Sequence, residues 1–76
     1  MANYKYYTVM VHYDLQTTRI EYAEKKTAME TADRLNYFFA TNGLKIEVSL
    51  HETTCQVEFD IDDNETLKED SIEISY

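Results

Sequence analysis

The 76-residue sequence has no proline, no tryptophan, one glycine (Gly43) and one cysteine (Cys55). Without proline, and with so little glycine, no stretch has the composition of a flexible linker or a low-complexity segment. One glycine also excludes the glycine-rich loops that bind phosphate groups. A lone cysteine cannot form a disulfide within the chain, which is typical of small domains in a reducing compartment.

Long apolar runs are missing as well. No segment approaches the roughly 20 apolar residues of a membrane span, and the opening M-A-N-Y-K-Y-Y lacks the apolar run of a signal peptide. We therefore expect a cytoplasmic protein, in the cytoplasm of the host cell if its source is viral. The length predicts a single domain, residues 1–76, near the lower limit for a core that folds unaided.

Negative charge is in excess, and it is concentrated near the end of the chain. The net charge is −8, and residues 58–73 contribute −7 of it, with eight acids and one base. These acids are Glu58, Asp60, Asp62, Asp63, Glu65, Glu69, Asp70 and Glu73. Such a field attracts basic surfaces and is repelled by nucleic acids and anionic membranes. We predict that these acids bind a protein partner; the alternative is a solvated face that keeps the domain soluble.

The first part of the chain alternates in the manner of a hairpin. Residues 4–13 form a predicted strand, which a turn at 14–17 joins to a second strand at 18–23. The more apolar face of the first strand should meet the core through Tyr7, Val9, Val11 and Tyr13. Its other face carries Tyr4, Tyr6, Met10 and His12, which we predict to be a secondary partner face or a homodimer face, because tyrosine is common at binding hot spots.

A helix is predicted over residues 27–42. Thr27 and Glu30 have the spacing of a capping box, and Asn42-Gly43 is a typical helix end. Its apolar stripe contains Ala28, Ala32, Leu35 and Phe39.

Two more alternating runs follow the helix. The first points Ile46, Val48 and Leu50 inward, and 51–54 should form a turn. The second points Cys55, Val57, Phe59 and Ile61 inward. Residues 63–70 could hold a helical turn capped by Asn64, and 71–76 a short last strand. The chain therefore predicts a two-layer α+β fold, in which one helix packs on an antiparallel sheet of four to five strands in the order β-β-α-β-β.

The second of these runs suggests a row of carboxylates. Alternate residues on a strand lie about 6.7 Å apart, twice the rise per residue. Glu58, Asp60 and Asp62 would then form a regular anionic row, similar to the backbone of a nucleic acid.

Catalytic and metal-binding patterns are weak. Asp60-x-Asp62-x-Asn64 matches the opening of a calcium loop, but Glu65 stands where that loop needs glycine and Ser71 where it needs glutamate. His12, His51 and Cys55 lack the spacing of a zinc site. We predict no catalytic residue, metal site or cofactor, and no enzymatic activity.

Small size, acidity, richness in tyrosine and the β-β-α-β-β order together resemble small phage-encoded inhibitors of host defence, of the anti-CRISPR and DNA-mimic type. The resemblance is one of general character. It implies a non-enzymatic protein that blocks a basic, nucleic-acid-binding surface of a host protein, such as a CRISPR effector or a nuclease. The alternative is a structural or regulatory protein-interaction module, with the acids serving solubility.

Overall fold

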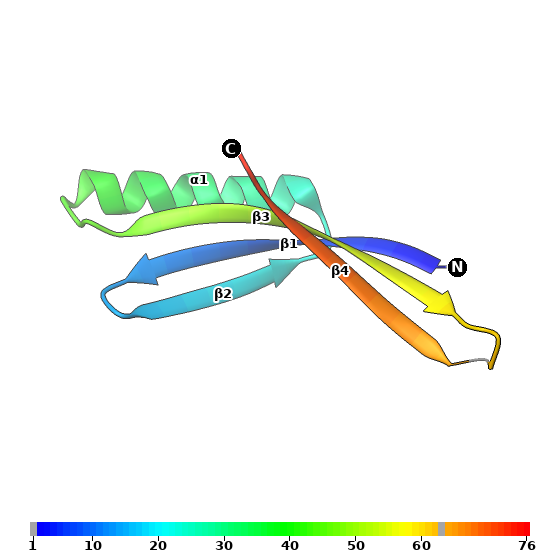
Figure 1. The fold of residues 1–76 in the computed structure, drawn as a ribbon. Helices are drawn as coiled ribbons and strands as arrows, with labels where there is room; N and C mark the ends of the chain where they lie inside the picture. Colours follow the sequence, from blue (N-terminus) through cyan, green and yellow to red (C-terminus); the bar gives the residue numbers. More distant parts are fainter. Residues whose placement is uncertain (1, 63) are drawn as a thin grey trace.

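A computed structural model describes residues 2–62 and 64–76 of the chain. In chain order, the elements are β1 (Ala2–Tyr13), β2 (Gln16–Tyr22), α1 (Lys25–Thr41), β3 (Glu47–Phe59) and β4 (Glu65–Ile74). The strands form one antiparallel sheet in the order β2-β1-β3-β4, and α1 packs against one face of it (Figure 1). This confirms the predicted α+β fold and its β-β-α-β-β order.

The first hairpin turns tightly at Asp14 and Leu15, and β2 begins earlier than predicted, at Gln16. Asp14 has a φ of 55°. Aspartate tolerates this left-handed conformation better than most residues, because its short side chain can bond to the local backbone. The turn pairs Val9 with Ile20 across the two strands.

The helix begins before the predicted capping box. Its N-cap residue is Glu24, whose side chain makes no capping hydrogen bond. Thr27 therefore lies within the first turns, where its carbonyl accepts a hydrogen bond from the Thr31 hydroxyl at 2.9 Å. The predicted end is confirmed: the Asn42 N–H bonds to the Phe38 carbonyl, and Gly43 follows with a φ of 68°.

The core lies between α1 and the middle of the sheet. Val9, Leu50, Ala28 and Ala32 form a fully buried cluster. Half-buried apolar side chains pack around it, namely Tyr7, Tyr22, Met29, Leu35, Val48 and Ile74. The two alanines let the helix backbone approach the sheet closely. The prediction for Tyr13 is wrong, because this residue lies beside the hairpin turn and is exposed.

The greatest departure from the sequence prediction is the length of β3. This strand passes without interruption through residues 51–54, where a turn was expected. It does so because β1 pairs with residues 47–57 of β3, from His12↔Glu47 to Ala2↔Val57, so each residue of 51–54 has a partner on β1.

An uninterrupted strand changes which way its apolar residues point. Side chains on a strand alternate between faces, so Leu50 faces α1 while Cys55 and Val57 lie on the opposite face. We call these the helix-side face and the open face of the sheet. The predicted inward direction of Cys55, Val57 and Phe59 is therefore wrong with respect to the helix.

β4 replaces the helical turn expected within residues 63–70. It pairs with β3 from Phe59↔Glu65 to Leu50↔Ile74. The ladder with β3 outweighs the local helix-capping tendency of Asn64, because it pairs ten residues of β4 with β3.

The sheet is longer than the helix. The molecule measures 55 × 27 × 15 Å, and α1 packs along β1, β2 and β3, while β4 meets the core cluster at its last residue, Ile74. Figure 1 shows the hairpin of β3 and β4 extending past the end of α1, together with the start of β1. We call residues 53–73 the acidic hairpin.

Candidate functional site

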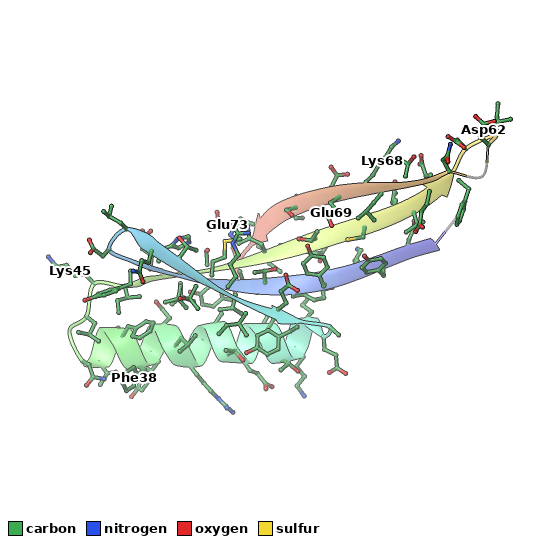
Figure 2. All side chains as sticks on the ribbon, turned by 90° about the horizontal axis from the view of Figure 1, so that it is seen from below. Phe38, Lys45, Asp62, Lys68, Glu69 and Glu73 are labelled. Atoms are coloured by element: carbon green, nitrogen blue, oxygen red, sulfur yellow. The ribbon has the colours of Figure 1, made fainter. Side chains whose placement is uncertain are left out.

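The acids of the acidic hairpin emerge on both faces of the sheet and at its tip. Glu65, Glu69 and Glu73 lie on the open face, each four residues from the next along β4. Glu58 and Asp70 lie on the helix-side face. Figure 2 shows Asp62 at the tip of the hairpin, with Glu69 and Glu73 spaced along β4. Asp63, which was also predicted, lies outside the described residues.

The predicted single row of Glu58, Asp60 and Asp62 is wrong. β3 ends at Phe59, and Asp60 turns the chain. Its Oδ1 atom accepts hydrogen bonds from the N–H groups of Asp62 and Asn64, both at 2.9 Å, and its own N–H donates to the Asn64 carbonyl at 3.1 Å. Asp60 therefore shapes the turn, and its carboxylate is only partly available to a partner.

Little positive charge offsets these acids. Among the described residues the ion pairs are Lys68 with Glu58, at 3.3 Å, and Lys5 with Glu52, at 3.4 Å. Both pairs are partly exposed, and such pairs contribute at most about 1 kcal/mol to stability. The other described carboxylates of the hairpin have no Lys or Arg side chain within ion-pair distance, so negative charge is exposed on both faces of the arm.

The predicted secondary face does come together on the open face. Tyr4, Tyr6, Met10 and His12 alternate along β1 on the side away from α1. Tyr4 is 52% exposed, and two side chains on the same face are exposed to a similar degree, Leu67 at 53% and Phe59 at 62%. An aromatic and aliphatic strip thus runs beside the open-face acids; its role in binding remains a prediction.

Cys55 lies within this strip, but it is fully buried among its neighbours. Its Sγ atom lies 3.8 Å from Oε1 of Glu69. A hydrogen bond and an electrostatic interaction with Cys55 are the main causes that raise the pKa of the Tyr4 phenol, and burial and the negative charge of Glu69 raise it further. The thiol is packed as a small side chain between neighbours on the sheet surface.

A polar cluster that the sequence did not predict lies at the other end of the open face. Ser49 Oγ lies 3.1 Å from His12 Nε2 and 3.2 Å from His51 Nε2, and His12 Nδ1 lies 3.3 Å from Thr17 Oγ1. A hydroxyl has a single proton, so it donates to only one imidazole, and the other must donate to it. The β1–β3 register brings the two histidines to either side of Ser49. This cluster was missed from the sequence because a turn, and not a continuous strand, was predicted at residues 51–54.

This cluster borders an open cavity of about 490 Å³. The cavity lies where β4 ends opposite Leu50 and leaves the first residues of β3 without a partner on that side. Glu47 and Glu73 line it along with both histidines. Within residues 2–62 and 64–76, no three His, Cys, Asp or Glu side chains are placed to hold a metal ion.

The chain matches no protein-family model, and neither a curated protein nor a solved structure is significantly similar to it. In the described part of the chain, no helix has the length and apolar character needed to cross a membrane. The functional argument therefore depends on the geometry and charge of the molecule itself.

Proposed function

We propose that this protein is a non-enzymatic inhibitor whose acidic hairpin enters a basic, nucleic-acid-binding cleft of another protein. One observation carries the proposal: a narrow arm projects past the helix and presents carboxylates on both faces and at its tip. A single anionic face would suit a flat basic surface. Charge on both faces suits a cleft with basic walls on either side.

The electrostatics favour several contacts acting together. Two unit charges 4 Å apart interact by about 1 kcal/mol in water and by about 4 kcal/mol at the effective dielectric constant of a protein surface. One exposed pair is therefore too weak to hold a partner, whereas several in a cleft steer association and add affinity. By its general resemblance to phage-encoded inhibitors, the target would be a host protein such as a CRISPR effector or a nuclease.

A second function is favoured by the exposed strip on the open face. Tyr4, Phe59 and Leu67 are each more than half exposed, and aromatic side chains with area and a hydroxyl are common at protein interfaces. The protein would then be an interaction module, and the acids would maintain solubility.

Three variants used as baits in a bacterial lysate at low salt separate the two functions. The hairpin variant, Asp62→Asn, Glu65→Gln and Glu69→Gln, removes three charges from the arm and spares Asp60. The helix variant, Glu24→Gln, Glu30→Gln and Asp33→Asn, removes three charges elsewhere. The strip variant, Tyr4→Ser and Leu67→Ser, keeps every charge.

We expect the wild type and the helix variant to capture the same protein and the hairpin variant to lose it. Excess duplex DNA should release the captured protein, and so should 1 M salt, where the Debye length falls to about 3 Å. Equal loss by the hairpin and helix variants would show a general charge effect and contradict the proposal. Loss by the strip variant alone, with no response to salt, would support the interaction module.

A further inference from the structure

The sheet has two edge strands, β2 and β4, and they differ in their protection against pairing. An edge strand presents unpaired N–H and C=O groups, which another strand can join. β4 carries Glu65, Glu69, Asp70 and Glu73 with only Lys68 to offset them. Two β4 strands side by side would bring eight carboxylates together with two lysines, so net repulsion opposes their pairing.

β2 has none of this protection. Its seven residues, Q-T-T-R-I-E-Y, contain no proline or glycine, and their only charges are Arg19 and Glu21. All except Tyr22 are exposed, including Ile20 at 36%. Such an edge is open to pairing with another strand.

The order of these residues is complementary to itself. In an antiparallel pair of two β2 strands, the residues on either side of the centre lie opposite each other. Centring the pair on Arg19 would place two guanidinium groups in opposition, and centring it on Glu21 would oppose two carboxylates. Centring it on Ile20 places Arg19 opposite Glu21 of the second copy, twice, because the arrangement is symmetric.

The same register also serves the apolar side chains. Side chains alternate along β2, so Arg19 and Glu21 share the open face while Ile20 points to the helix side. The two Ile20 side chains would then pack against each other, and Thr18 would lie opposite Tyr22. Opposite charges and apolar groups that face each other across strands both stabilise a sheet.

We propose that β2 is a homodimer interface, in which two copies join antiparallel about Ile20 into one continuous eight-stranded sheet. The strand order becomes β4-β3-β1-β2-β2-β1-β3-β4, so the two acidic hairpins lie at opposite ends. This inference depends only on the edge of β2 and is independent of the function proposed for the hairpin. The dimer would be modest in affinity, because strand addition alone gives a small interface.

Charge exchange tests the register directly. Sedimentation of the wild type, over a roughly hundredfold range of concentration, should show a monomer–dimer equilibrium. Arg19→Glu and Glu21→Arg should each raise the dimer dissociation constant at least tenfold, since each places like charges opposite each other. The double variant, Arg19→Glu with Glu21→Arg, restores the complementary pairs and should dimerise like the wild type, whose net charge it keeps.

Two further measurements keep the outcome interpretable. An equimolar mixture of the two single variants should form heterodimers, because one acidic edge then meets one basic edge. Lys68→Glu on β4 should leave the dissociation constant unchanged. Circular dichroism melting shows that each variant is folded. A wild type that stays monomeric throughout the range, or a double variant that is no better than the single ones, overturns the proposal.

Discussion

The half of the sheet beneath α1 and the acidic hairpin beyond it share the same strand, β3, yet they are organised by different forces. Under the helix, Leu50 is completely buried against Val9 and two alanines. Nine residues later along the strand, Phe59 is 62% exposed and lies opposite Glu65. One half is held by burial of apolar area, and the other by ladder hydrogen bonds with little apolar cover.

This difference indicates how the molecule can place so much charge in one region. Carboxylates close together repel one another and would destabilise a compact core. In the hairpin they stand in water, where they cost less, and the helix-covered half provides most of the stability. Regions with few buried contacts open locally more readily, which also suits a segment that must fit a partner.

The largest expected loss of stability comes from a substitution in the core of the helix-covered half. Leu50→Ala removes the largest fully buried side chain and should destabilise the protein by about 3 kcal/mol, from lost burial and the cavity left behind. Leu67→Ala on the hairpin, its matched control, should cost less than about 1 kcal/mol, because Leu67 is half exposed. Urea unfolding measures both values. Equal losses of stability in the two variants would mean that side chains of the hairpin are packed as tightly as those beneath α1.

An intermediate effect is expected at the tip of the hairpin. Asp60→Ala removes the acceptor of two backbone hydrogen bonds and should cost about 1 kcal/mol. Asp60→Asn keeps a side-chain oxygen in the same place and should cost much less. The two variants have the same net charge, so the difference between their free energies of unfolding in urea reports the loss of the side-chain acceptor in the turn. If Asp60→Asn proved as costly as Asp60→Ala, charge rather than the turn would be the cause.

The smallest effect concerns the contact between the C-terminus and the helix-covered half. The Tyr76 hydroxyl donates a hydrogen bond to the Val48 carbonyl at 2.7 Å, and burial and the nearby charge of Asp33 raise the pKa of this phenol. Tyr76→Phe should cost about 0.5 kcal/mol at neutral pH, a low value because the side chain is partly exposed.

The raised pKa also predicts a dependence on pH. Above the ordinary phenol pKa of about 10, Tyr76 ionises in the unfolded chain before it ionises in the folded one, so folding loses stability as pH rises. The wild type should therefore lose more stability between neutral pH and pH values above the ordinary phenol pKa than Tyr76→Phe does. Thermal melting across this range measures the difference. Parallel curves for the two proteins would contradict the role given to Tyr76.

Several features could be predicted from local pattern. The alternation of residues 4–13, the apolar stripe of Ala28, Ala32 and Leu35, and the Asn42-Gly43 helix end all depend on neighbours within a few residues. These features were enough to predict the fold class and the order of its elements. The concentration of acids in residues 58–73 is likewise a property of composition alone.

Other features depended on partners that are distant in the chain. A polar run such as 51–54 looks like a turn by itself, and it became part of β3 because β1 and β4 pair with it on either side. The same pairing set the face of each carboxylate and brought His12 to Ser49.

Short-range periodicity and charge content therefore established an acidic α+β domain, because helical and strand preferences act between near neighbours. Where each acid points, how far the hairpin extends past α1 and which edge stays open were decided by strand register. Register is a long-range property, since it arises only when segments separated by tens of residues form hydrogen bonds with one another.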